Sequence, residues 1–342
     1  MTIKDIAKKC GVSVTTVSRA INNLPGINEK TKEMIMQVIK EEGFVPNNSA
    51  RVLKQHESNT IVVIIKGIDN LFFQPMLTEI LENVNTEKYS MMLHYIPTDE
   101  DEIDVAQQIV IERKPKGIIF LGGFFINEGE RIRRWGVPCV VVASGRVDED
   151  SAAVCSYFNV DDFKESYKAV ESLIQKGHRR IALLCSCKDE PSISYKRLAG
   201  YKKALEDYQI EVDEQLIIHS KDDANAYTVE RGYADTKKII KNHIDCTAIY
   251  AISDLVAMGV CRALIEEGKS IPDDYSVMGY DGLEISNYYN PSLTTIKQPV
   301  KEMARRAVKT LFDMMKGKQD IVHCVMEGEL MERESTASIN ER

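Results

Sequence analysis

Hydrophobic residues follow two different spacings along the 342-residue chain. Up to about residue 46, apolar positions recur three and four residues apart, as on one face of a helix. From Thr60 onward, short β-branched runs alternate with longer amphipathic stretches, which is the pattern of β–α units. The chain is therefore expected to contain an all-helical head over residues 1–46, a linker over residues 47–59, and an α/β body over residues 60–342.

The head is expected to contain three helices. The first begins near residue 3 and ends at Gly11, and the second runs from about Val14 to Ile21. Because only about three residues separate them, their spacing is that of a helix-turn-helix. The third helix follows Asn28 and ends at Gly43, and its apolar face is expected to consist of Met34, Ile35, Val38 and Ile39.

The outer face of the second helix carries short polar residues and one arginine. Short side chains let a helix lie deep in the major groove of DNA, and Arg19 can donate two hydrogen bonds to a guanine edge. An ordinary three-helix bundle shows the same spacing, so the pattern alone leaves both interpretations open. The residues expected to contact DNA in the head are Thr2, Ser13, Val14, Thr15, Thr16, Ser18, Arg19 and Asn22.

The body is expected to hold parallel sheets with helices on both faces, because strands and helices alternate. About 280 residues exceed one small doubly wound sheet, so two lobes are expected. The candidate strands are Ile61–Ile65, Ser90–Tyr95, Gly117–Leu121, Cys139–Ala143, Arg180–Leu184, Leu216–His219, Ala248–Ala251, Ser276–Gly279 and Thr294–Ile296.

The charge distribution changes what composition says about partners. The net charge of −8 argues against nucleic acid, since affinity for phosphate comes from Lys and Arg. Residues 1–56, however, carry a net charge of +4, which leaves −12 for the remaining residues. A basic head on an acidic body is compatible with DNA binding by the head alone.

Other features exclude several classes of protein. No apolar run approaches the roughly 18 residues of a membrane span, and the N-terminus lacks a signal-peptide core, so a cytoplasmic protein without membrane contact is expected. The eight cysteines form no Cys-x-x-Cys pair and the six histidines are scattered, so neither metal nor cofactor is expected. No nucleophile–base pair is visible, and Ala263 replaces the first glycine of a phosphate-binding loop, so no enzyme is expected.

The segment Ile3–Asn22 resembles the signature headpiece of the lac repressor/galactose repressor family. Gly43–Asn47 and Ala50–Leu53 resemble the segment that comes after the headpiece in that family, and the match continues to Ser335–Ala337. The resemblance implies a homodimeric transcriptional regulator that binds pseudo-palindromic operator DNA. It also implies a sensor with the two-lobed periplasmic-binding-protein fold. The helix from about Phe73 to Asn85 and the strand after it are expected to contribute to the dimer interface.

The linker over residues 47–59 is implied by the resemblance to be a hinge. Its helical part of about seven residues is too short to be stable alone in water. In the family it folds on operator DNA, where a leucine wedges apart a base step in the minor groove, whereas a simple linker is the alternative from the residues alone. The hinge residues expected to contact DNA are Asn47, Ala50 and Leu53.

The resemblance also implies a ligand site between the lobes, at the carboxyl ends of the strands. The lobes are expected to span residues 60–160 with 291–322, and 161–289 with 324–340, with crossovers near residues 160, 290 and 323. The alternatives are core packing for the two phenylalanines, a surface ion pair for the arginine and an exposed loop position for the tyrosine. The effector-binding residues expected are Phe72, Phe73, Ser144, Ile193, Arg197, Tyr227, Ser253, Asp254 and Asp281.

Aromatic rings together with Arg and Asp form a set that recognises sugars, since rings stack on C–H faces and polar groups bind hydroxyls. The expected function is therefore repression of carbohydrate-utilisation genes under control of a sugar or sugar phosphate. Two alternatives stay open. One is a regulator whose co-repressor is a phosphoprotein or a nucleobase. The other is a pure solute-binding protein, which the basic head opposes.

Overall fold

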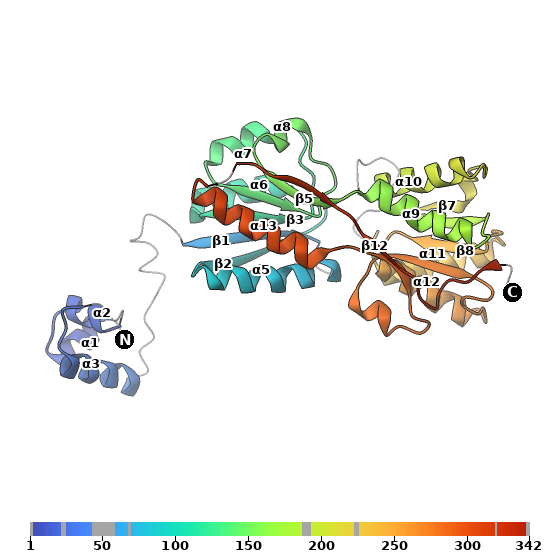
Figure 1. Cartoon of the computed structure of the whole chain (residues 1–342). Helices are drawn as coiled ribbons and strands as arrows, with labels where there is room; N and C mark the ends of the chain where they lie inside the picture. Colours follow the sequence, from blue (N-terminus) through green and yellow to red (C-terminus); the bar gives the residue numbers. More distant parts are fainter. Residues whose placement is uncertain are drawn as a thin grey trace. The chain divides into compact units, whose positions relative to one another are not determined.

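The computed structural model describes residues 3–21, 25–42, 59–67, 70–186, 193–221, 226–318 and 320–339. The chain divides into two compact units, Met1–Ser58 and Asn59–Arg342 (Figure 1). The first unit is called the head here and the second the body.

The head contains the three predicted helices, α1 (Ile3–Cys10), α2 (Val14–Ile21) and α3 (Glu29–Glu41). Ile6, Val17 and Ile35 are fully buried at their contact. The prediction for Met34 is wrong, because its side chain is 42% exposed. Ile35 and the positions three and four residues after it already form the buried stripe, and Met34 lies about 100° away from Ile35 around the helix.

The first lobe of the body is built on a parallel sheet of six strands, in the order β11-β5-β4-β3-β1-β2. Helices α5 and α13 cover one face and α6 and α7 the other, because alternate residues of β1 point to opposite faces (Figure 1). The strands are β1 (Thr60–Lys66), β2 (Ser90–Ile96), β3 (Gly117–Leu121), β4 (Cys139–Val142), β5 (Ser156–Val160) and β11 (His323–Met326). The helices are η1 (Leu71–Phe73), α5 (Gln74–Thr86), α6 (Glu102–Arg113), α7 (Gly129–Trp135), α8 (Glu149–Ala152) and α13 (Val300–Met315).

The second lobe has a sheet of the same size, in the order β12-β10-β9-β8-β6-β7, in which only the edge strand β12 is antiparallel. Helices α9 and α10 pack on one face, and α11 and α12 on the other. The strands are β6 (Ile181–Cys185), β7 (Ile217–His219), β8 (Ala248–Ala251), β9 (Ser276–Asp281), β10 (Thr294–Lys297) and β12 (Glu329–Met331). The helices are α9 (Asp162–Gln175), α10 (Ile193–Asp207), η2 (Glu214–Leu216), α11 (Val229–Lys241), α12 (Asp254–Glu266) and η3 (Glu284–Asn287).

The chain crosses between the lobes three times, after β5, after β10 and after β11 (Figure 1). Two of the expected lobe assignments need correction. Strand β10 pairs with β9 in the second lobe, although residues 291–297 were expected in the first. Strand β11 pairs with β5, so the last crossing follows Met326 rather than residue 323. The partner of a short apolar run is decided by tertiary contacts, which a local pattern does not contain.

Three strands, β5, β11 and β12, were not predicted. Strand β5 contains Ser156 and Asn159, which interrupt its apolar run. Strands β11 and β12 are mainly exposed or half-buried edges, so hydrophobic alternation is weak there. In the part of the chain that the structure describes, no helix has the length and apolarity required to cross a bilayer.

Candidate functional site

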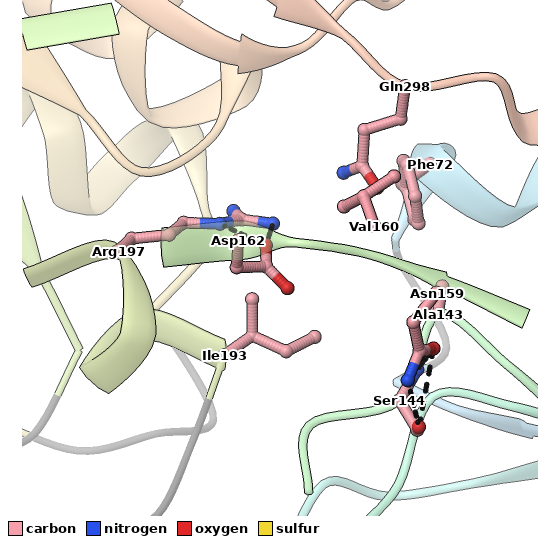
Figure 2. Close-up of a pocket in the computed structure, with 9 residues that line it drawn as sticks. All are labelled: Phe72, Ala143, Ser144, Asn159, Val160, Asp162, Ile193, Arg197 and Gln298. Carbon is pink, nitrogen blue, oxygen red and sulfur yellow. Dashed lines mark hydrogen bonds and ion pairs between the residues drawn. The ribbon is translucent and has the colours of Figure 1, made fainter. Parts of the chain in front are cut away.

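A small pocket with a cavity volume of about 20 Å³ lies between the two lobes (Figure 2). One wall comes from the first lobe and the other from the second, and Gln298 comes from the crossover between β10 and α13. The site lies where strands end and loops begin, as in other open α/β folds. The lining residues are Phe72, Ala143, Ser144, Asn159, Val160, Asp162, Ile193, Arg197 and Gln298.

Arg197 lies in the wall of the pocket that the second lobe provides. It is only 4% exposed, and its Nε and Nη2 each lie 2.9 Å from Oδ1 of Asp162. Its Nη1 donates to the carbonyl of Ile252, and its guanidinium lies 3.6 Å from the ring centroid of Tyr280. The ion pair that the sequence left open is therefore buried rather than on the surface. These contacts use only part of the N–H groups of the guanidinium, so it can still donate to a ligand.

The first-lobe wall combines an aromatic ring with two polar side chains. Phe72 packs edge-on against Phe73, with ring centroids 5.3 Å apart. The backbone N–H of Ser144 donates to Asn159 Oδ1 at 2.9 Å, and Asn159 Nδ2 donates to Ser144 Oγ at 3.1 Å. Both phenylalanines belong to the core of the first lobe, as the core-packing alternative predicts, and Phe72 also lines the pocket.

Four of the nine expected effector-binding residues line the pocket: Phe72, Ser144, Ile193 and Arg197. Of the others, Tyr227 packs against the core of the second lobe. Asp281 does not line the pocket itself. Its Oδ1 accepts a hydrogen bond of 3.0 Å from Nε2 of Gln298, which does line it.

Ser253 and Asp254 do not line the pocket, and both have structural partners. Ser253 caps α12 by accepting from the N–H of Val256 at 3.3 Å. The Asp254 side chain is completely buried. It accepts hydrogen bonds from the hydroxyls of Thr295 at 2.6 Å and Ser286 at 2.7 Å, and from the N–H of Leu283 at 2.7 Å. These three hydrogen bonds hold the Asp254 side chain against the loop after β9.

Sequence reasoning missed Asn159, Asp162 and Gln298. Asn159 and Asp162 lie at the end of β5 and just after it, and β5 was not recognised as a strand. Gln298 immediately follows β10, which was recognised. Polar residues at the end of a strand or just after it are the signal that would have found all three.

Two buried carboxyl groups behind the pocket have raised pKa values. Burial raises the pKa of Asp254 to about 6, although hydrogen bonds from Thr295, Ser286 and Leu283 act in the opposite direction. Burial also raises the pKa of Asp281 well above its usual range, against the lowering effect of Arg197. Both groups therefore hold a proton in the folded chain at pH values where an unfolded chain has released it.

This difference predicts a pH dependence of stability. A carboxyl group with a raised pKa in the folded state contributes stability at low pH. That contribution is lost as the pH rises through the folded value. The unfolding free energy should therefore decrease between about pH 4 and pH 6, and Asp254→Asn should remove up to about 3 kcal/mol of that decrease. Urea unfolding at several pH values measures it, with the exposed Asp99→Asn as control. Parallel pH profiles for both variants would contradict the assignment.

The candidate DNA-contacting face of the head lies on α2. Ser13, Val14, Thr15 and Arg19 are exposed, and Thr16 and Ser18 are half-buried. Val17 and Ala20 point into the core instead. Ser13 holds the start of the helix, since its Oγ accepts from the N–H of Thr16 at 3.1 Å. The other expected DNA contacts, Thr2, Asn22, Asn47, Ala50 and Leu53, lie outside the described residues.

Comparison with known proteins agrees with this arrangement. Residues 2–47 match the model of bacterial regulatory proteins of the lacI family, and residues 170–336 match a periplasmic binding protein-like domain. The chain is 37% identical over 342 residues to the HTH-type transcriptional regulator MalR of Clostridium butyricum, which covers 99% of this chain and 100% of the relative.

Two solved structures share the fold. The complex of the transcriptional regulator CelR with cellobiose has a TM-score of 0.71 and 26% identity, covering 98% of this chain and 99% of that one. The lac repressor dimer bound to operator has a TM-score of 0.76 and 24% identity, with the same coverage. The head has an exposed α2, the body has two lobes, and the 37% identity to a regulator extends over 342 residues. The chain therefore belongs to the lacI family of bacterial regulatory proteins and is a DNA-binding transcriptional regulator.

Proposed function

We propose that the chain represses carbohydrate-utilisation genes and responds to a sugar or sugar phosphate bound between its lobes. The pocket carries this proposal, because it combines a phenyl ring with amide, hydroxyl and guanidinium groups on facing walls. Rings stack on the C–H faces of sugars, and the polar groups bind hydroxyls. The cellobiose in the similar CelR complex supports the same class of ligand.

The dimensions of the pocket favour a sensor that changes shape. Its cavity volume of about 20 Å³ lies far below the roughly 300–1,000 Å³ of ordinary ligand sites. Lys196 Nζ also donates to the Gly145 carbonyl at 3.0 Å, which joins α10 of the second lobe to the loop after β4 of the first. A disaccharide would enter only if the lobes moved apart, so ligand binding would shift the equilibrium between lobe arrangements.

The proposed partner on the DNA side is a pseudo-palindromic operator bound by a homodimer, with one head on each half-site. The effector would change the angle between the lobes and hence the spacing of the two hinges in the dimer. Operator affinity would follow through the hinge residues Asn47, Ala50 and Leu53. A coupling of this kind requires that the effector bind the two lobe arrangements with different affinities.

The dimer interface is proposed to include α5 and the edge strand β2. Leu81, Leu93 and Tyr95 expose 42%, 40% and 39% of their surface there. We expect Leu93→Asp combined with Tyr95→Asp to convert the dimer into a monomer, because both charges would lose their hydration at the interface. Sedimentation equilibrium measures the change. Ile111→Asp, on the other face of the same lobe and 69% exposed, is the control. A dimer that survives the double substitution would place the interface elsewhere.

Titration calorimetry tests the proposed ligand class with the full-length chain. The panel contains mono- and disaccharides, their phosphates, and nucleobases. Binding of one sugar or sugar phosphate, lost on Arg197→Met, supports the proposal. Binding of nucleobases alone would overturn it, as would a response only to a phosphorylated protein.

A further inference from the structure

All six strands of the first-lobe sheet run in parallel, so the loops that precede them lie along one edge. The surface that these loops form at the amino ends of the strands is called the entry edge here, because β1 begins there. Asn59, the first described residue of the body, donates from Nδ2 to the carbonyl of Lys88 at 2.9 Å. The N–H of Lys116 donates to the carbonyl of Thr60 at 2.9 Å. The chain therefore enters the body between two lysine-bearing loops.

The entry edge is basic although the body as a whole is acidic. Its loops contain two acidic residues, Glu87 and Asp320, and Glu87 pairs with one of the lysines at 2.9 Å. The opposite edge carries the acidic run Asp99–Asp101 in the turn after β2. This acidic run and the lysines of the entry edge thus lie at opposite ends of the strands. The lysines of the entry edge are Lys88, Lys114, Lys116, Lys316 and Lys318.

Two of these lysines occupy positions that ordinarily favour glycine. Lys88 has φ of 62° and Lys114 has φ of 47°, and both are exposed. The left-handed region costs a residue with a Cβ about 1 kcal/mol, which is why glycine commonly follows a helix there. Lysine at both places therefore keeps charge at this edge at some cost in backbone strain.

We propose that the entry edge, with Lys88, Lys114 and Lys116, is a second DNA-contacting surface that binds backbone phosphates without reading sequence. The inference rests on the proposed function, in which operator affinity depends on the hinge residues up to Leu53. Six residues of chain from Leu53 to Asn59 span at most about 22 Å. Long lysine side chains at the entry edge then reach the phosphates that flank the groove, where each contact releases counterions.

The test combines Lys88→Gly with Lys114→Gly in the full-length chain. Glycine relieves the backbone strain at both positions, so the variant should unfold at the same or a higher urea concentration. The probes are a duplex selected from a random-sequence pool with the unaltered chain, and an unrelated duplex of equal length. We expect about tenfold weaker binding to both at low salt. The slope of log affinity against log salt should become shallower by about one for each lost contact.

Two controls separate charge from backbone effects. Lys241→Gln with Lys269→Gln removes two positive charges from the second lobe, and Gln209→Gly with His243→Gly relieves positive φ there. Both controls should leave the salt slope unchanged. If the Lys88→Gly, Lys114→Gly variant bound its duplex with an unaltered dependence of log affinity on log salt, the inference would be overturned. The proposed function would stand in that case, because the chain would still bind DNA. Failure of the unaltered chain to bind any duplex would instead contradict the proposed function.

Discussion

Replacing Arg197 with methionine is expected to lower the unfolding free energy by about 3–5 kcal/mol, because Asp162 would keep a buried charge without its partner. The side chains of both residues are 5% exposed, so water cannot substitute for the lost guanidinium. Tyr280 would also lose the cation over its ring. Urea unfolding of the full-length chain, followed by circular dichroism, measures the loss.

A second variant separates the ion pair from simple damage to packing. Adding Asp162→Asn to Arg197→Met removes the unpaired charge and should restore most of the stability. Arg262→Met, which breaks an exposed ion pair with Glu266, should cost much less, because solvent screens that pair. Both pocket variants should lose sugar binding. If Arg197→Met lowered the unfolding free energy as little as Arg262→Met, the ion pair between Arg197 and Asp162 would not stabilise the wall of the pocket.

Replacing Leu53 with alanine is expected to weaken operator binding by about a hundredfold. An apolar wedge in the minor groove costs a few kcal/mol of base unstacking, which the contacts it permits must at least repay, and about 1.4 kcal/mol corresponds to a factor of ten. Sugar affinity should stay nearly constant, because the hinge and the pocket belong to different parts of the chain. Filter binding measures the DNA affinity and calorimetry the sugar affinity.

Val52→Ala is the matched control, since it shortens a neighbouring apolar residue that has no assigned wedge role. It should weaken operator binding much less than Leu53→Ala. Equal losses of DNA and sugar affinity in the Leu53 variant would contradict the assignment of DNA binding and sugar binding to different parts of the chain. Equal effects of the two hinge variants would contradict the wedge.

Local patterns were sufficient for most elements of the fold. The ends of α2 and β3 agree with the predicted ones, because a helical stripe and a fully apolar run are complete within the segment itself. Strands β11 and β12 lacked such a signal, since each lies at a sheet edge and has no fully buried residue. The lobe that receives β10 also depends on a distant partner, β9.

The site was predicted less completely than the fold. Arg197 was found through the family resemblance and Phe72 through its position after the first strand, and the structure places both on the pocket wall. Asp162 was missed because its role depends on Arg197, which lies 35 positions away and meets it only after folding. Asp254 was assigned to the ligand because Ser253–Asp254 occupies the place where the family that the sequence resembles usually carries Asn-Asp. Its three hydrogen bonds come from residues 283–295, whose return to α12 no local pattern contains.

The central claim is that a ligand between the lobes controls the binding of DNA by the head. Operator affinity measured by filter binding, with and without a saturating sugar identified by calorimetry, tests it most directly. The account predicts a change of about 5- to 150-fold, which corresponds to a coupling free energy of roughly 1–3 kcal/mol, and predicts that Arg197→Met abolishes this change. A sugar that binds the pocket and leaves operator affinity unaltered would contradict the account.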